Sequence, residues 1–137
     1  MNRPLRRLMR GESGQELIEF ALASLIFLIT VFGTLEFGLG VWQYNMVSDL
    51  AQEGARWASV RGSTSSILHA SSADVQTYVQ GRSTGVTVTV TATPDPSTLA
   101  PGATVSVLVQ TTFSPLTSLI PFAAMTLQST AQMVIAR

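Results

Sequence analysis

The longest hydrophobic stretch of the chain lies near its amino terminus. Sixteen residues without a charge run from Phe20 to Leu35. As an α-helix this run covers about 24 Å, at 1.5 Å per residue. Apolar residues on either side extend it to roughly the 30 Å of a bilayer core, and a helix pairs its own backbone polar groups, as lipid requires. The pattern therefore predicts a membrane-spanning helix over residues 15–41, with Trp42 and Tyr44 at the membrane interface.

The helical pattern continues beyond the predicted span, over residues 42–61. Apolar residues recur there at helical spacing, and polar residues occupy the opposite side. The apolar positions are Val47, Leu50, Ala51, Gly54, Trp57 and Ala58. On the polar side, Glu53 and Arg56 are spaced to form a weak ion pair. We therefore expect one helix from about Gln15 to Val60, whose outer half has an apolar stripe that another part of the chain must cover.

Three segments in the second half of the chain alternate between apolar and polar residues, as half-buried β-strands do. They are residues 85–94, 104–113 and 127–136. Between the long helix and the first strand, residues 62–84 should form a loop and a short helix from about Ser72 to Gln80, closed by Gly81. The sequence thus predicts an α+β fold. A three-stranded antiparallel sheet, within residues 85–137, would lay its valine face on the helix stripe and expose threonine to water.

Charge is scarce and unevenly distributed. Charged residues make up 12% of the chain, about half the usual share for a soluble domain, and hydrophobic residues make up 46%. All eight basic residues are arginine, and four of them lie in the first ten positions. By the positive-inside tendency we expect this cluster to stay in the cytoplasm and the carboxyl-terminal part to lie on the other side of the membrane. No further basic patch follows, so we expect no nucleic-acid partner.

Residues that could carry chemistry are few. The chain has no cysteine, which excludes disulfides and a thiolate zinc site. His69 is the only histidine, and its polar surroundings predict a surface residue rather than a metal ligand. Asp74 and Asp95 are isolated and lie in or near predicted turns, and no serine has the sequence context of a nucleophile. We therefore expect no enzyme activity, no metal and no cofactor.

Three glutamates border the hydrophobic run and require an explanation, because a carboxylate in the middle of a span costs about 2.5–3.5 kcal/mol and less near its ends. Glu16 and Glu19 either reach for water at the interface, or Glu19 awaits a cationic partner. Glu36 either reaches the opposite interface, the interpretation that we favour, or forms a second pairing between subunits. Small residues at four-residue spacing beside it allow close helix approach in lipid, although small residues are common in such helices. The candidates for helix packing are Thr30, Thr34, Glu36 and Gly38.

Three blocks of the sequence stand out: GQELIEFAL at 14–22, LEFG at 35–38 and LAQEGARWASV at 50–60. In this order and at these spacings they resemble the TadE-like minor pilins, or pseudopilins, of the Tad (Flp) type IV pilus system. The resemblance covers about residues 10–61, and the hydrophobic run lacks the proline that many relatives carry. A long helix packed on a small antiparallel sheet is also the plan of type IV pilins, and the strand pattern of the second half predicts that plan independently.

The resemblance implies that residues 1–14 are a basic leader, which a prepilin peptidase removes by cutting between Gly14 and Gln15. Glu19, followed by Phe20, would then be the fifth residue of the mature chain. It would be the assembly carboxylate, paired with the new amino-terminal amine of a neighbouring subunit. The implied partners are the prepilin peptidase, other pilin or pseudopilin subunits, the pilus assembly platform and the lipid membrane.

Two alternatives stay open at this point. A cut after Gly11 would make Glu16 the fifth residue, but Leu17 rather than an aromatic residue follows it, so the cut after Gly14 is preferred. The chain could also be an uncleaved single-pass anchor for an extracytoplasmic binding module. A secretory signal peptide is less consistent with the sequence, because no small-x-small cleavage site follows the hydrophobic run. We therefore expect a minor pilin that supports Tad pilus biogenesis, with the uncleaved membrane anchor as the alternative.

Overall fold

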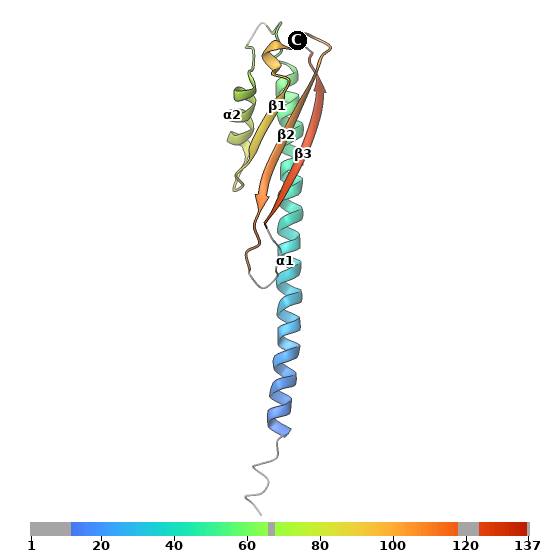
Figure 1. The fold of residues 1–137 in the computed structure, drawn as a ribbon, viewed down its shortest axis with the longest axis vertical. Coiled ribbons are helices and arrows are strands. Elements are labelled where there is room, and N and C mark those ends of the chain that lie inside the picture. Colours follow the sequence, from blue (N-terminus) through green and yellow to red (C-terminus); the bar gives the residue numbers. More distant parts are fainter. Residues whose placement is uncertain (1–11, 66–67, 118–123, 137) are drawn as a thin grey trace, which may run out of the picture.

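The structure is a computed structural model, and it describes residues 12–65, 68–117 and 124–136. Its elements in chain order are α1 (Glu12–Ser59), α2 (Ser72–Arg82), β1 (Thr89–Thr93), the short 3-10 helix η2 (Pro96–Thr98), β2 (Thr104–Phe113) and β3 (Met125–Val134). Figure 1 shows α1 as a long rod whose upper part is covered by the sheet and α2, while its lower part extends alone. This arrangement confirms the predicted α+β fold, and α1 lies close to the expected bounds.

The three strands form one antiparallel sheet in the order β1-β2-β3. Burial alternates residue by residue along β1 and β2, as the sequence pattern predicts for strands with one covered face. The buried valines face α1 and α2 and are Val88, Val90, Val105, Val107 and Val109. The opposite face, rich in threonine and glutamine, is largely exposed, so the core is a single layer between the sheet and the helices.

The covered face of α1 is the predicted apolar stripe, and it is built largely from small side chains. Its buried hydrophobic members are Val47, Leu50, Ala51, Ala55 and Ala58. Gly54 lies where α2 and β2 both approach α1 closely. A Cβ added at this position would lie 2.8 Å from Cγ2 of Val79 in α2 and 3.2 Å from Cγ1 of Val107 in β2. The absence of a side chain at Gly54 therefore lets both α2 and the sheet pack directly on α1.

The prediction that Gly81 closes α2 is wrong. Gly81 is helical, and the helix continues to Arg82 before Ser83 adopts an extended conformation. The backbone N–H of Ser83 donates to the carbonyl oxygen of Gln80, which closes the last turn without a left-handed residue. A glycine near the end of a helix indicates termination only where that residue takes a positive φ, and Gly81 does not.

The strand bounds agree with the sequence pattern to different degrees. β2 has the predicted bounds, and β3 lies two residues earlier than predicted. β1 is shorter than the predicted strand at 85–94, because its ladder with β2 begins at Thr89. Before that residue, the side-chain hydroxyl of Thr111 donates to the carbonyl oxygen of Thr87 at 2.8 Å. A side chain thus replaces the backbone partner, and the regular strand stops there.

The two edges of the sheet differ. Along β1, the hydroxyl of Ser72 donates to the carbonyl oxygen of Ala92 at 2.9 Å, and Nε2 of Gln80 donates to that of Val88 at 3.3 Å. Side chains of α2 therefore occupy hydrogen-bonding groups of the β1 segment. On the opposite side, no described residue outside the sheet hydrogen-bonds to the backbone of β3. β3 is thus the open edge within the part of the chain that the structure describes.

Candidate functional site

The residues proposed for leader cleavage and assembly all lie on the uncovered part of α1. Gly14, Gln15, Glu19 and Phe20 are exposed, the last to 72%. Nothing lies within 4 Å of the position that a Cβ would take at Gly14. The fold itself therefore contacts none of the side chains of Gln15, Glu19 and Phe20. Cleavage after Gly14 and the pairing of Glu19 stay predictions.

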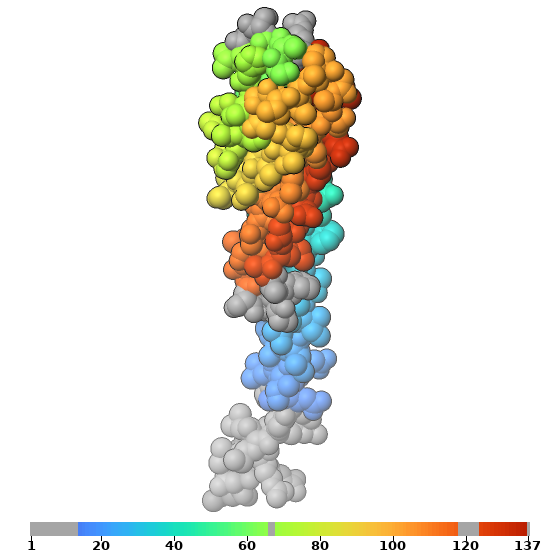
Figure 2. Space-filling view, turned by 45° about the horizontal axis from the view of Figure 1, so that its top comes forward, coloured from blue at the N-terminus to red at the C-terminus, as the bar shows by residue number. Residues whose placement is uncertain are grey.

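The surface of this part of α1 is apolar and exposed. α1 contains a candidate membrane span, because its most apolar stretch is long enough to cross a bilayer and is not buried in the fold. The exposed side chains include Leu17, Ile18, Ile26 and Phe27, at 64–69%. Figure 2 shows the blue lower part of α1 emerging from beneath the sheet. In water such a surface would be unfavourable, whereas a bilayer would cover it.

The small residues on the lower part of α1 satisfy their polar groups internally. The hydroxyl of Thr30 donates to the carbonyl oxygen of Ile26, and that of Thr34 to the carbonyl oxygen of Thr30, each at 2.8 Å. The hydroxyl donors of Thr30 and Thr34 are therefore both paired within the helix itself. Gly38, one turn further on, has open space around its Cα. The face is therefore suited to close helix approach, and its use for packing stays a prediction.

Glu36 makes the contact that sequence reasoning missed. Its side chain is 6% exposed, and Oε1 accepts hydrogen bonds from the backbone N–H of Thr117, at 2.7 Å, and from the hydroxyl of the same residue. Thr117 follows β2 and is 81 residues away in sequence. Oε2 is also buried and has no donor among the described residues. No periodic pattern in the sequence relates two positions so far apart. The contact between Glu36 and Thr117 could therefore not be predicted from the sequence.

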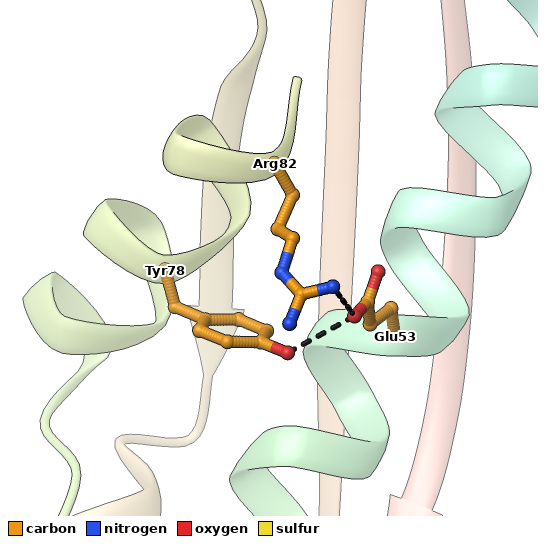
Figure 3. A network of polar contacts seen from close by, with 3 residues as sticks. All are labelled: Glu53, Tyr78 and Arg82. Carbon is orange, nitrogen blue, oxygen red and sulfur yellow. Dashed lines mark hydrogen bonds and ion pairs between the residues drawn. The ribbon is translucent and has the colours of Figure 1, made fainter. Parts of the chain in front are cut away.

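Glu53 lies at the junction of α1 and α2. The hydroxyl of Tyr78 donates to Oε1 of Glu53 at 3.0 Å, and Nη1 of Arg82 lies 3.0 Å from the same oxygen. Figure 3 shows both side chains of α2 reaching toward Glu53. The predicted pairing of Glu53 with Arg56 is wrong, because α2 supplies a tertiary partner and Arg56 points to solvent. The acidic residue of the EGARW sequence thus helps to position α2.

Aromatic rings extend this junction. The rings of Trp57 and Tyr78 stack with centroids 4.8 Å apart and an angle of 17° between their planes. The guanidinium of Arg61 lies 4.2 Å from the centroid of the Trp57 ring, and that of Arg82 lies 5.2 Å from the Tyr78 ring. Burial raises the pKa of Tyr78, and its hydrogen bond to Glu53 raises it further. The junction is therefore held by stacking and charge together.

The remaining ionisable side chains considered in the sequence stabilise turns. Asp74 and Ser71 form a capping box at the start of α2, and the Ser71 hydroxyl lowers the pKa of Asp74. Asp95 accepts hydrogen bonds from Ser97 and from the backbone N–H of Ser72, which together lower its pKa. His69 is exposed, with Nδ1 3.0 Å from a backbone carbonyl oxygen. Among the described residues, no group of three potential ligands could hold a metal ion.

An apolar helix that continues into a small helix-and-sheet domain defines the general class of this protein: an α+β domain carried on a candidate membrane-spanning helix. Comparison with known families narrows that class. Residues 14–56, about a third of the chain and all within α1, match the family model described as TadE-like protein, so the chain is similar to TadE-like proteins in this region. This family is a structural pilus component and not a known family of enzymes. No curated protein and no solved structure matches the chain.

Proposed function

We propose that the chain is a minor pilin, or pseudopilin, that supports the biogenesis of a Tad pilus. It is inserted in the cytoplasmic membrane with its amino terminus in the cytoplasm and its sheet on the opposite side. A prepilin peptidase cuts between Gly14 and Gln15, and the trimmed subunit joins other pilin-like subunits at the assembly platform. The observation that carries this proposal is the TadE-like match, which begins at residue 14 on an exposed and apolar part of α1.

In this proposal Glu19 has its partner on another subunit. Its side chain is exposed on α1, and its neighbours Ile18 and Phe20 are apolar and exposed to 64% and 72%. A new amine at Gln15 would be mostly cationic at neutral pH. When two such helices pack in lipid, a carboxylate without a counter-charge is costly, so pairing the amine with Glu19 favours one relative depth of the two subunits.

The cleavage is tested by measuring the mass of the amino terminus of the protein isolated from native membranes. The wild-type chain should begin at Gln15, and Gly14→Asp should retain the leader because the larger charged side chain replaces the residue at the cut. Gly11→Asp is the matched control and should be trimmed as usual. A native protein that still begins at Met1 would refute the proposal and favour the uncleaved membrane anchor.

The pairing is tested by comparing Glu19→Gln with Glu16→Gln. Both positions are exposed on the same part of α1, and both changes remove one carboxylate charge. We expect both variants to insert in the membrane and to be trimmed. Only Glu19→Gln should fail to co-purify with the other subunits of the pilus machinery. Normal incorporation of Glu19→Gln would exclude the charge pairing, even if cleavage at residue 14 were established.

A further inference from the structure

The segment that follows β2 is fixed against α1 at the lower end of the sheet. The backbone N–H of Thr117 donates to Oε1 of Glu36 at 2.7 Å, and the hydroxyl of Thr117 donates to the same oxygen. One turn further along α1, the ring of Phe113 lies 3.8 Å from the position that a Cβ would take at Gly40. Two contacts therefore hold this segment at a defined height along the helix (Figure 1).

That height coincides with the end of the candidate membrane span. The twenty residues from Leu17 to Glu36 form a helix about 30 Å long, which is the thickness of a bilayer core. A span that begins at Leu17 therefore fills the core by Glu36, earlier than the outer bound at residue 41 expected from the sequence. The headgroup layer adds roughly 5–7 Å on each side. Leu116 is adjacent to Thr117, so their Cα atoms are about 3.8 Å apart. When α1 crosses a membrane, Leu116 therefore lies at the level of the headgroup layer.

The surface at this level is apolar and carries no charge. Leu116 is 80% exposed, more than any other large hydrophobic side chain that the structure describes. On α1 itself, Phe37 is 74% and Trp42 49% exposed. The sequence contains no charged residue between positions 96 and 136, nor between positions 37 and 48. An exposed connection in water is normally polar, whereas this surface is continuous with the apolar surface of the span.

We propose that residues 114–117 form a second membrane contact, in which Leu116 enters the interfacial layer of the bilayer. Glu36 positions the contact, because its hydrogen bonds with Thr117 fix the segment at the outer end of the span. The sheet then rests on the membrane at a set height and tilt. The partner is the lipid bilayer, as the continuity with the span and the absence of charge indicate. This contact requires that α1 be inserted in a membrane, and it does not require removal of the leader.

The absence of cysteine allows the contact to be measured with single reporters in the full-length chain. Leu116→Cys reports on the proposed contact, Leu28→Cys on the span, and Ala100→Cys on an exposed position in the β1–β2 connection. Each thiol carries the same small polar fluorophore. The proteins are reconstituted in vesicles of phosphatidylethanolamine and phosphatidylglycerol that contain lipids spin-labelled in the headgroup or deep in the acyl chain. Iodide serves as the aqueous quencher.

We expect the reporter at 116 to be quenched several-fold more than that at 100 by the headgroup spin label, and to be protected from iodide. The reporter at 28 should respond most to the deep spin label. If 28 responds and 116 behaves like 100, the second contact is refuted while insertion of α1 stands. If 28 does not respond either, insertion itself fails. Protection of 116 from iodide without spin-label quenching would identify another copy of the chain, and not lipid, as the occupant.

The role of Glu36 is tested by two substitutions in the Leu116→Cys protein. Glu36→Leu removes the acceptor for both donors of Thr117, so the quenching of the 116 reporter by the headgroup spin label should fall toward that of the 100 reporter. Glu36→Gln keeps an acceptor oxygen at the same position and should retain most of the quenching. Equal quenching in all three proteins would show that Glu36 does not position the contact.

Discussion

The close approach of α2 and the sheet to α1 at Gly54 leads to a sharp prediction. Gly54→Ala should lower the free energy of unfolding, although alanine is the better helix former. The added Cβ would lie 2.8 Å from Cγ2 of Val79 and 3.2 Å from Cγ1 of Val107. Both valines are buried, at 1% and 0% exposure, and their β-branched side chains have little rotamer freedom with which to move away. The elements themselves would have to separate.

The size of the change in free energy of unfolding caused by Gly54→Ala follows from two opposing effects. Ordinary contact between carbon atoms begins at about 3.5 Å, so the new methyl would be roughly 0.7 Å too close to Val79. Overpacking of a well-packed core costs about 1–3 kcal/mol, and the enclosed site favours the upper part of that range. Replacing glycine by alanine in a helix gains about 0.8–1.0 kcal/mol. We therefore expect a net loss of about 1–2 kcal/mol.

Urea unfolding of the full-length protein in detergent micelles measures this loss, with Trp57 as the fluorescent probe in a Trp42→Phe background. Gly81→Ala is the matched control. Gly81 is also helical, but it is exposed and has open space around its Cα, so the substitution should stabilise by about 0.5–1 kcal/mol. In the double variant Gly54→Ala/Val79→Ala the two changes should be coupled favourably, by about 1 kcal/mol. Stabilisation by Gly54→Ala equal to that by Gly81→Ala would refute the close approach.

Two further predictions concern ionisable groups and use the same unfolding assay. Tyr78→Phe should cost about 1 kcal/mol, because it removes the hydroxyl that donates to Glu53. The folded state raises the pKa of Tyr78, so the contribution of Tyr78 to the free energy of unfolding is present below about pH 10 and is lost as the pH rises through the folded-state pKa. The stability of Tyr78→Phe should therefore fall less at alkaline pH than that of the wild type. An equal fall in both proteins would contradict this role. Asp95→Asn should cost about 1 kcal/mol at neutral pH, at the low end for a charged acceptor because Asp95 is partly exposed. The folded state lowers the pKa of Asp95, so the greater stability of the wild type over Asp95→Asn is present above about pH 4 and disappears as the pH falls through the folded-state pKa. A stability difference that persists in acid would exclude this role of the Asp95 carboxylate.

The fold was predictable wherever one pattern of burial extends over several turns or several strand residues. The apolar stripe of α1 and the alternating valines of β2 identify their elements, because apolar residues recur there at the period of a helix or of a strand. The ends of elements depend instead on single hydrogen bonds. The hydroxyl of Thr111 ends the β1 ladder, and the N–H of Ser83 closes α2. Such local bonds leave no periodic signal, and the predicted ends differ from the structure there.

The candidate site shows the same limit. Gly14 and Glu19 are exposed, and the role outside the fold that the resemblance to TadE-like proteins implies for them stays a prediction. The partners of Glu36 and Glu53 were not predictable, because Thr117 and Tyr78 are 81 and 25 residues away. The sequence shows that a carboxylate in an apolar region requires a hydrogen-bond donor. Only the tertiary structure shows which distant residue provides that donor.

The three blocks that resemble TadE-like proteins now separate into two kinds. The second and third blocks contact the remainder of this chain, through Glu36 with Thr117 and through Glu53 with α2. The first block, residues 14–22, has only exposed side chains and touches no other element. Substitutions in the later blocks should therefore change the unfolding of the isolated protein. A side chain that contacts nothing within its own fold cannot be needed for that fold, so Glu19→Gln should leave unfolding unchanged and should act only where another molecule meets the helix.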